Sequence, residues 1–367
     1  MKKDHVETIG IIGLGLIGGG LARTIKRVYP DIRIIAYNRT NEVLNEALYE
    51  GIIDEPSWDI TEVFSECDYI FLCVPVLSVR EYLELLKPHL SEGTILSDVG
   101  STKSEIHAMV KELELERFFI GGHPMTGSEK TGYAHSTDRM FENAWYILTP
   151  SEEMELQEVS AFSAFISSLG ALPLILTAAE HDHITAAVSH VPHVISACLV
   201  NMVRELDDEH TYMKMIAAGG FKDITRISSS SPQMWQEICM ANTEEICSIL
   251  DKYVRMLTEF RFAIRNEDSD KLLEYFTECK EYRDSFQEQT SGPIRREYRI
   301  YTDLNDEAGA IAEIAAILAA AHISIKNIGI VHNRSYERGV LRIEFYEEDP
   351  SRQAAELLRT KGYTVYE

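Results

Sequence analysis

The chain has 367 residues, of which 45% are hydrophobic and 26% are charged, a composition typical of a globular protein rather than a disordered or fibrous one. Since domains usually hold about 100 to 200 residues, we expect two or three of them. The 35 basic and 59 acidic residues give a formal net charge of −24, which opposes binding to nucleic acid and to anionic lipid, and the sequence contains no basic patch that would override it.

Residues 1 to 177 alternate short β-rich runs with helical patterns, which predicts a doubly wound parallel sheet in a dinucleotide-binding domain. Several runs are continuously apolar, as expected of strands that helices cover on both faces. Ligands of such sheets bind beyond the carboxyl ends of the strands. The expected strands are Thr8 to Ile12, Arg33 to Tyr37, Tyr69 to Val74, Thr94 to Asp98, Phe118 to Gly121, Trp145 to Leu148 and Leu172 to Leu176.

A glycine-rich turn follows the first expected strand and opens a helix. Gly13, Gly15 and Gly18 form the pattern G-x-G-x-x-G. Gly13 permits the tight turn, Gly15 lets the backbone approach a pyrophosphate, and Gly18 allows close packing of helix on strand. Amide groups at the helix N-terminus, where Leu16 and Ile17 lie, favour the negative charge. The turn therefore predicts that the chain binds a dinucleotide.

The residue that selects between NAD and NADP is expected after the second strand. Asn38, Arg39 and Thr40 stand there, in place of the acidic residue that favours NAD. Asn38 can hydrogen-bond ribose hydroxyls, whereas Arg39 can accept a 2′-phosphate or be a solvated loop charge. This turn leaves NAD and NADP open, and Val74 and Pro75 at the end of the third strand complete the expected cofactor site.

Two further strand ends carry polar side chains that face the expected cofactor. Ser101 lies in Asp98-Val-Gly-Ser-Thr-Lys, and His123 lies in Gly121-Gly-His-Pro-Met. An imidazole titrates near neutrality and can take a proton from a substrate hydroxyl, and a serine hydroxyl can orient its ring. Ser101 is equally compatible with a helix N-cap.

From residue 178 to 291 the β-rich runs vanish, which predicts an all-helical domain for substrate binding and dimerisation. Helices of the expected length pack against each other or against a second subunit. The long helices are expected at Ala178 to Glu205, Thr243 to Asn266 and Ser269 to Gln289.

The start of this helical domain gathers four histidines between Glu180 and His193, and His190 and His193 lie three residues apart on one helical face. Zinc sites need three or four convergent ligands and no cysteine joins the group, so we expect no metal here. Pro192 suggests a kink that aims these side chains into a cleft, although a pair of histidines that packs helices together is also consistent. Farther on, Arg226 is a candidate clamp for a substrate carboxylate or a member of an ion pair within the domain.

Residues 291 to 293, Ser-Gly-Pro, mark a linker. Residues 294 to 367 follow the order βαββαβ, which predicts a ferredoxin-like module, a fold with many unrelated uses. The strands are expected at Arg299 to Thr302, Ile323 to His332, Gly339 to Tyr346 and Tyr363 to Tyr366, and the helices at Gly309 to Ala321 and Ser351 to Lys361.

The six cysteines form no C-x-x-C pair, which suggests neither a zinc knuckle nor a disulfide framework and fits a reducing cytoplasm. Glycines between positions 10 and 20 interrupt the apolar N-terminal stretch, so we expect no signal peptide. No uninterrupted run reaches the roughly 18 apolar residues of a membrane span. We therefore expect a cytoplasmic protein without membrane contact.

In this order, the motifs resemble those of the prephenate dehydrogenase family, in its form with a C-terminal ACT domain. The resemblance spans essentially the whole chain. It implies NAD-dependent oxidative decarboxylation of prephenate to 4-hydroxyphenylpyruvate, a step of tyrosine biosynthesis. The motifs are the glycine turn, Asp98-Val-Gly-Ser101, Gly122-His123-Pro124-Met125, Gly127-Ser128-Glu129, Ser189-His190-Val-Pro-His193 and Gly220-Phe-Lys-Asp-Ile-Thr-Arg226.

The resemblance also implies roles for single residues. His123 hydrogen-bonds the ring hydroxyl and accepts its proton as a hydride leaves the same carbon, and Ser101 orients His123. Aromatisation and loss of carbon dioxide drive the reaction, so no metal is needed. Substrate contacts are assigned to Arg226 for a carboxylate, to His193 with His190 on the pyruvyl side, and to Glu129, which helps order the network.

Residues 294 to 367 resemble an ACT domain, a module that often pairs and binds amino acids, which implies feedback inhibition of a homodimer by tyrosine. Ala308 stands where the family usually has proline. Three alternatives stay open: an arogenate dehydrogenase, another dehydrogenase of small hydroxy acids, and a non-catalytic sensor of a dinucleotide and an amino acid. The expected effector contacts are Asn305, Ala308, Gly309, Asn327 and Ile328.

Overall fold

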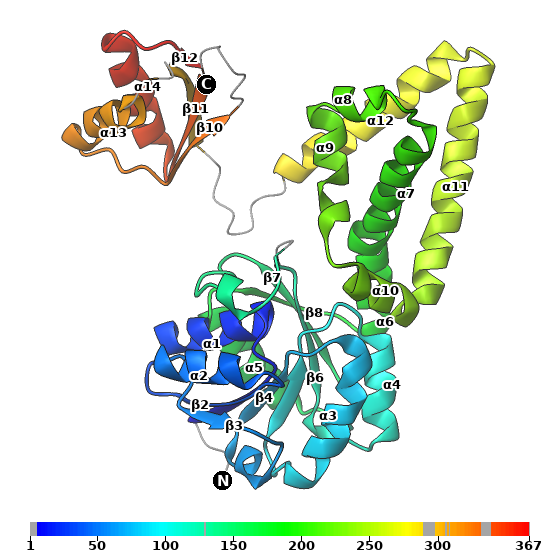
Figure 1. Cartoon of the computed structure of the whole chain (residues 1–367), viewed down its shortest axis with the longest axis vertical. Coiled ribbons are helices and arrows are strands. Elements are labelled where there is room, and N and C mark those ends of the chain that lie inside the picture. Colours follow the sequence, from blue (N-terminus) through cyan, green and yellow to red (C-terminus); the bar gives the residue numbers. More distant parts are fainter. Residues whose placement is uncertain are drawn as a thin grey trace. The chain divides into compact units, whose positions relative to one another are not determined.

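The structure is a computed structural model that describes residues 6–127, 130–288, 298–304, 307, 309–331 and 339–366. The chain divides into two compact units, Met1–Phe262 and Ala263–Glu367, which we describe separately (Figure 1).

The first unit opens with a five-stranded parallel sheet in the order β3-β2-β1-β4-β5. The chain winds outward in both directions from β1, so the gap between the ends of β1 and β4 is the switch point where such sheets bind ligands. The short β3 was not expected, since Glu-Pro-Ser has little β propensity. The strands are β1 (Thr8–Ile12), β2 (Arg33–Tyr37), β3 (Glu55–Ser57), β4 (Tyr69–Leu72) and β5 (Ile95–Asp98), and the helices are α1 (Leu16–Val28), α2 (Asn41–Tyr49), η1 (Glu62–Glu66), η2 (Val76–Ser78), α3 (Val79–Leu86), η3 (Lys87–His89), α4 (Ser104–Glu112) and η4 (Glu116–Phe118).

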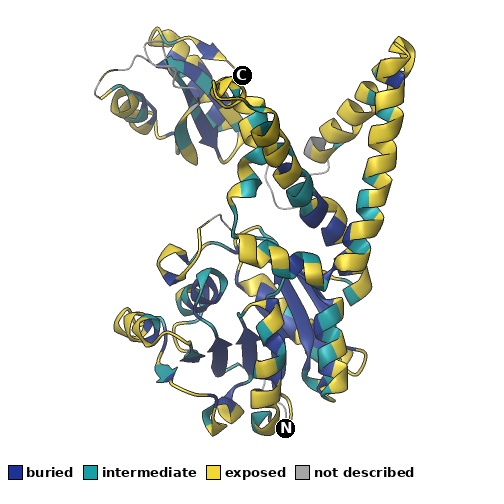
Figure 2. Ribbon diagram, turned by 45° about the vertical axis from the view of Figure 1, so that its right-hand side comes forward, coloured by how far each residue is buried: buried dark blue, intermediate teal, exposed yellow. Residues whose placement is uncertain are grey.

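Helices cover both faces of this sheet, and each face has its own apolar core. Ile11 of β1 packs with Leu21 of α1 and Phe162 of α5 (Leu156–Ser168), on the face that α2 also covers. The next residue, Ile12, points to the other core and packs with Leu83 of α3. Each such buried side chain contributes about 1.5–3 kcal/mol. Figure 2 shows the strands buried and the outer faces of the helices exposed, so the doubly wound class predicted from the sequence is confirmed.

A second sheet, of three strands, is joined to β5 by an isolated parallel bridge between Leu96 and Phe119. Its strands are β6 (Ile120–Pro124), β7 (Trp145–Pro150) and β8 (Leu172–Ile175). The parallel pairing predicted from the sequence is wrong for β6 and β7, which pair antiparallel. A parallel pair needs a crossover connection, usually a helix. Among its described residues the β6–β7 connection has only the turn η5 (Tyr133–His135), and this segment packs on α1, where a Cβ on Gly19 would lie 2.7 Å from Tyr133.

The helical part of the first unit begins directly after β8. The helix expected from Ala178 onward is interrupted by a π-helical turn, η6, just before Pro192, which lacks the N–H of a regular helical bond. The helices are α6 (Ala178–Thr185), η6 (Ala186–His190), α7 (Val191–Leu206), α8 (Tyr212–Ile216), α9 (Gly219–Thr225), η7 (Arg226–Ser229), α10 (Pro232–Ala241) and α11 (Thr243–Arg265), of which α11 reaches the second unit.

Among the described residues, one helical run, Ala178–Leu206, is long and apolar enough to cross a membrane by length and composition, with a hydropathy of 1.4. Helices of soluble domains pass the same test. This run carries the buried polar side chains of His181, Asp182 and His190. Its exposed apolar residues, such as Val188 and Met202, are available for packing against other helices.

The second unit contains α12 (Ser269–Glu288) and a βαββαβ module. The sheet order β10-β11-β9-β12, with every pair antiparallel, is that of a ferredoxin-like fold and confirms the predicted class. Ile314 of α13 and Leu358 of α14 are fully buried in its core with Leu341 of β11. The elements are β9 (Tyr298–Leu304), α13 (Ala310–Ala320), β10 (Asn327–Val331), β11 (Gly339–Phe345), α14 (Glu348–Thr360) and β12 (Val365–Tyr366).

Candidate active site

In the glycine turn between β1 and α1, packing requires glycine at two of the three motif positions but not at the third. Gly13 has a φ of 98°, and a Cβ on it would lie 2.5 Å from the carbonyl oxygen of Cys73. A Cβ on Gly18 would lie 2.0 Å from the carbonyl oxygen of Gly13. A Cβ on Gly15 would meet nothing within 4 Å. Only Gly15 is therefore left open to a ligand.

The N-terminus of α1 is open to an anion. The helix begins at Leu16 and Ile17, its N-cap Gly15 has no side chain to cap it, and its first turn contains no acidic residue. The first amide groups of a helix lack partners within the helix and carry positive potential. A phosphate group is the ligand that such a terminus binds best.

The Asn38 side chain links the end of β2 to the glycine turn through a hydrogen bond. Its Oδ1 accepts a hydrogen bond from the Leu14 N–H at 3.0 Å, and its Nδ2 donates to the Thr40 carbonyl at 3.0 Å. The neighbouring Arg39 is exposed. The Asn38 amide thus has a structural role that the sequence did not reveal.

Val74 and Pro75 follow β4 on the other side of the turn. A Cβ on Gly13 would lie 3.2 Å from Cγ1 of Val74, and Pro75 is the N-cap of η2. The cofactor residues expected from the sequence therefore gather at the carboxyl ends of β1, β2 and β4.

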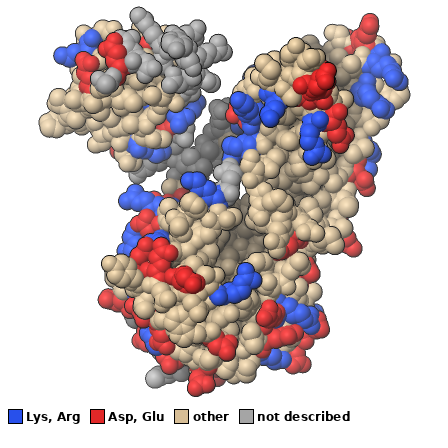
Figure 3. Space-filling view, in the orientation of Figure 1, with Lys and Arg blue, Asp and Glu red and all other residues tan. Residues whose placement is uncertain are grey.

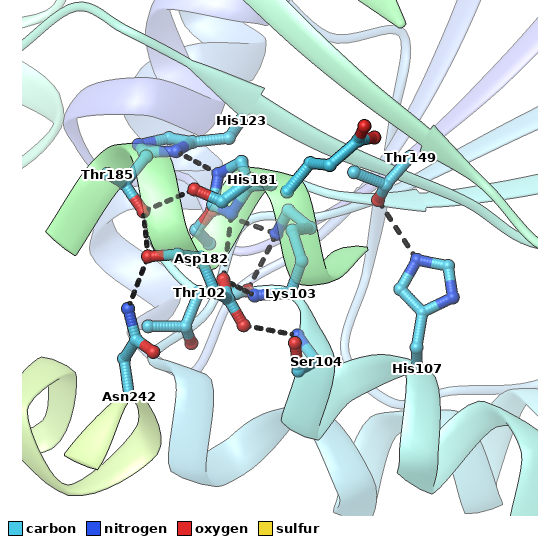
Figure 4. A network of polar contacts seen from close by, with 12 residues as sticks. Thr102, Lys103, Ser104, His107, His123, Thr149, His181, Asp182, Thr185 and Asn242 are labelled. Carbon is cyan, nitrogen blue, oxygen red and sulfur yellow. Dashed lines mark hydrogen bonds and ion pairs between the residues drawn. The ribbon is translucent and has the colours of Figure 1, made fainter. Parts of the chain in front are cut away.

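A buried chain of imidazole and carboxylate groups lies where β6 meets α6 (Figure 4). His123 of β6 is 8% exposed, and its Nδ1 lies 2.7 Å from Nε2 of His181. The Nδ1 of His181 lies 2.8 Å from Oδ1 of Asp182. The Asp182 carboxylate accepts hydrogen bonds from the backbone N–H groups of Lys103 and Ser104, at 2.8 and 2.7 Å. This contact joins α6 to the N-terminus of α4.

A buried ion pair supports the loop after β5. Nζ of Lys103 lies 2.5 Å from Oδ2 of Asp98, both side chains are fully buried, and Nζ also donates to the Gly100 carbonyl at 2.9 Å. The N–H of Gly122 donates to Oδ1 of Asp98 at 3.2 Å. Burial lowers the pKa of Lys103, and the charge of Asp98 opposes this shift. The pair holds the loop against β6, the strand that carries His123.

Ser101 lies half-buried in that same loop. In the described part of the chain its hydroxyl makes no hydrogen bond to His123, whose Nδ1 is bonded to His181 instead. Ser101 is not the N-cap of α4 either, because the Asp182 carboxylate supplies that cap. An orienting role for Ser101 stays a prediction.

His190 and His193 flank Trp235 of α10. The His193 ring stacks on the indole with centroids 3.5 Å apart, and its Nδ1 donates to the Ser189 carbonyl at 2.9 Å. Nδ1 of His190 lies 3.2 Å from Nδ2 of Asn242, which leaves Nε2 as the protonated nitrogen. This Nε2 and Nε1 of Trp235 are buried without a hydrogen-bond partner in the described part of the chain. No group of three or more metal-binding side chains occurs among the described residues.

Arg226 is exposed at the start of η7, next to the helix that carries His193. The Oγ atoms of Ser196 on α7 and Ser228 on η7 lie 2.5 Å apart. Because Ser196 is about one turn beyond His193, the segments that carry the two expected substrate contacts are adjacent. Glu129 lies outside the described residues.

The expected effector residues belong to the second unit. Gly309, with a φ of 98°, is the N-cap of α13, and Asn327 and Ile328 begin β10. Asn305 and Ala308 lie outside the described residues.

The buried histidines predict that the free energy of unfolding falls as the pH is lowered. Burial lowers the pKa of His190 to about 4, and burial also lowers the pKa of His123 and His181. Because an unfolded histidine titrates near ~6.5, the unfolded chain binds more protons between these values, so the free energy of unfolding falls as pH drops from about 6.5 to about 4, on the order of 3 kcal/mol for His190 alone.

Urea unfolding at a series of pH values measures this slope. His190→Gln is expected to reduce it, and His135→Gln, at an exposed histidine in η5, is the matched control. Equal slopes for the wild type and His190→Gln would contradict the prediction.

Charged side chains of both signs are interspersed over the face seen in Figure 3. On this face an anionic substrate therefore meets no large positive surface that would attract it.

Comparison with known proteins shows the family. Residues 21–174 match the model of the prephenate dehydrogenase nucleotide-binding domain, and residues 177–278 match that of the prephenate dehydrogenase dimerization domain. A prephenate dehydrogenase of Bacillus subtilis (strain 168) is 36% identical over 358 residues, which cover 97% of this chain and 96% of the relative. The chain belongs to the prephenate dehydrogenase family. The resemblance to this family found in the sequence is confirmed.

Solved structures of the family have the same fold. The prephenate dehydrogenase of A. aeolicus, in complex with hydroxyphenyl propionate and NAD+, matches with a TM-score of 0.73 and 30% identity, over 78% of this chain and 100% of that one. The arogenate dehydrogenase of Synechocystis matches with a TM-score of 0.69 and 29% identity, over 76% of this chain and 99% of that one. The prephenate dehydrogenase fold therefore occurs with two related substrates.

Proposed function

We propose that this chain catalyses the NAD-dependent oxidative decarboxylation of prephenate to 4-hydroxyphenylpyruvate. The observation that carries the proposal is a buried histidine, His123, at the same edge of the sheet as the glycine turn. His123 lies near the carboxyl end of β6, and the parallel bridge between Leu96 and Phe119 aligns β6 with β5. The carboxyl ends of β1, β4, β5 and β6 therefore share one edge.

The state of His123 suits a general base. Burial lowers its pKa well below the ordinary value, and the nearby His181, Lys103 and His190 act in the same direction. The imidazole is therefore neutral at pH 7 and able to accept the proton of the substrate hydroxyl.

The turn fits a dinucleotide, because Gly15 leaves open space and the N-terminus of α1 is uncapped. When bound, the oxidised nicotinamide supplies the hydride acceptor. His123 takes the proton of the substrate hydroxyl as the hydride leaves the ring carbon that bears this hydroxyl. The bond to the ring carboxylate then breaks, its electrons aromatise the ring, carbon dioxide leaves, and His123 returns the proton to the ring oxygen.

Substrate recognition falls to the helical side of the site. The buried N–H groups of His190 and Trp235 suit the oxygens of the pyruvyl group, beside His193. Arg226 pairs with a carboxylate, and Glu129 helps to order the network. Ser101 orients His123 once substrate is bound.

Arg226→Ala is expected to raise the apparent KM for prephenate by about 10- to 100-fold with a smaller effect on kcat, because a charge-assisted hydrogen bond is lost. Initial rates against prephenate concentration measure this. Arg204→Ala, at another exposed arginine of the helical part, is the matched control. An unchanged KM in Arg226→Ala would remove the clamp from the proposal.

Initial rates with prephenate or arogenate, each with NAD or NADP, test the function as a whole. We expect prephenate with NAD to give the highest kcat/KM, because the Asn38 side chain, which Leu14 and Thr40 hold at the end of β2, can hydrogen-bond ribose hydroxyls. A preference for arogenate would reassign the substrate. No reduction with either acid would favour a non-catalytic sensor.

We also propose a cytoplasmic homodimer with domains at residues 1–177, 178–291 and 294–367, the last an ACT domain through which tyrosine inhibits. Exposed apolar residues of the helical part, among them Met215, Ile216 and Val254, support dimerisation, and the ferredoxin-like sheet supports the ACT assignment. The tyrosine site would include Asn305, Ala308, Gly309, Asn327 and Ile328.

Tyrosine sensitivity is tested with the full chain and with a chain that lacks residues 294–367. Inhibition of the full chain alone is expected. Equal inhibition of both would place the effector site elsewhere.

A further inference from the structure

We propose that His181 and Asp182 form a positioning relay that fixes the tautomer and the orientation of His123. The inference rests on the proposed role of His123 as the base, and neither relay residue was singled out by the sequence motifs.

The relay is anchored at its carboxylate. Asp182 is 2% exposed and accepts hydrogen bonds from the Lys103 N–H, the Ser104 N–H and Nδ1 of His181. Two of the donors are backbone groups at the N-terminus of α4, where the helix dipole also favours a negative charge. Burial raises the pKa of Asp182, but the hydrogen bonds outweigh burial and hold this pKa below its ordinary value.

An ionised carboxylate can only accept hydrogen bonds. The carboxylate of Asp182 therefore fixes the direction of each hydrogen bond from Asp182 through His181 to His123. Nδ1 of His181 must carry a hydrogen and donate it to Asp182. Nε2 of the neutral His181 then has a lone pair, which accepts from Nδ1 of His123, 2.7 Å away. The remaining nitrogen of His123, Nε2, is left with its lone pair for the substrate hydroxyl.

The relay also supports the charge that forms during the reaction. When Nε2 of His123 takes a proton, the ring becomes an imidazolium whose Nδ1–H already points at His181. The Asp182 carboxylate lies behind His181 and polarises it, an effect that is strong in a buried network. The other charged groups near the relay of His123, His181 and Asp182 are Lys103 and Asp98, which are paired with each other.

The backbone of the two relay residues is held independently of His123. Oγ1 of Thr185 donates to the His181 carbonyl at 2.8 Å, and Nδ2 of Asn242 donates to the Asp182 carbonyl at 2.9 Å. Changes to the relay side chains therefore leave α6 with its backbone contacts intact.

Three single variants test the relay. His181→Leu removes the acceptor, and we expect kcat with prephenate to fall about 100-fold or more while the affinity for cofactor is unchanged. His181→Gln can place an amide oxygen near the Nε2 position, so we expect it to recover most of this loss. Asp182→Asn is expected to lower kcat by about 10²- to 10⁴-fold, because it removes the negative charge behind the imidazolium and sets an amide N–H against an N–H donor of His181, Lys103 or Ser104. His183→Gln, two residues from His181 and exposed, is the control.

A double variant separates positioning from general damage to the fold. A positioning residue acts through its target, so His123→Asn with His181→Leu should be no slower than His123→Asn alone. Multiplying losses in the double variant, or an unchanged kcat in His181→Leu, would overturn the relay.

Nitrogen-15 NMR of the imidazole rings provides a readout independent of turnover. We expect His123 to carry its hydrogen on Nδ1 in the wild type. A wild-type His123 protonated on Nε2 would refute the relay even in an active enzyme. A wild type that shows the expected tautomer but does not oxidise prephenate would instead refute the proposed function.

Discussion

Replacement of His123 by asparagine is expected to lower kcat with prephenate by about 10³-fold, because a positioned general base contributes about 10²- to 10⁴-fold. Asparagine is smaller than histidine and still offers a polar group toward His181, so β6 is expected to keep its pairing with β7. The affinity for NADH should stay within about twofold, since His123 does not belong to the glycine turn.

Steady-state kinetics and titration of NADH fluorescence measure both quantities. His135→Asn, at an exposed histidine in η5, is the matched control and should retain wild-type kinetics. Near-normal turnover of His123→Asn would exclude His123 as the base.

Gly15→Val is expected to weaken cofactor binding, whereas Gly18→Val is expected to destabilise the fold. Gly15 has an extended φ of −87°, and a Cβ there meets nothing within 4 Å, so Gly15→Val should fold. It should weaken NAD binding by about 100-fold, because the added side chain stands where the backbone would bond the pyrophosphate. In Gly18→Val the Cβ would lie 2.0 Å from a backbone oxygen, which cannot yield without moving the turn. We expect that variant to unfold at a markedly lower temperature.

Thermal unfolding without cofactor and titration with NAD distinguish the two outcomes. A Gly15→Val protein that binds NAD normally would show that the cofactor does not approach the turn at Gly15. A Gly18→Val protein with the wild-type unfolding temperature would show that the close contact of Gly18 with Gly13 is relieved at no cost.

The glycine turn, the doubly wound parallel sheet and the ferredoxin-like module could be predicted because their determinants are local. Gly13, Gly15 and Gly18 lie within one turn, and the β-rich runs carry their own periodicity. The antiparallel pairing of β6 and β7 could not be predicted in this way, since it depends on how the connection around Tyr133 packs on α1.

The candidate base was predicted, but its partners were not. His123 is separated from His181 by 58 residues and Ser104 from Asp182 by 78, so their contacts exist only when α6 packs on β6 and α4. The sequence showed His181 and Asp182 merely as part of a histidine-rich stretch, which was weighed as a metal site or as helix packing. An acidic residue beside a histidine in a first helical turn is the signal that was available, and it is weak without the fold.

The stoichiometry of one turnover tests the proposed chemistry most directly. Wild-type protein mixed with prephenate and NAD should form NADH, carbon dioxide and 4-hydroxyphenylpyruvate in equal amounts, and His123→Asn should form all three about 10³-fold more slowly. NADH without carbon dioxide, or no NADH from prephenate at all, would contradict oxidative decarboxylation at this site.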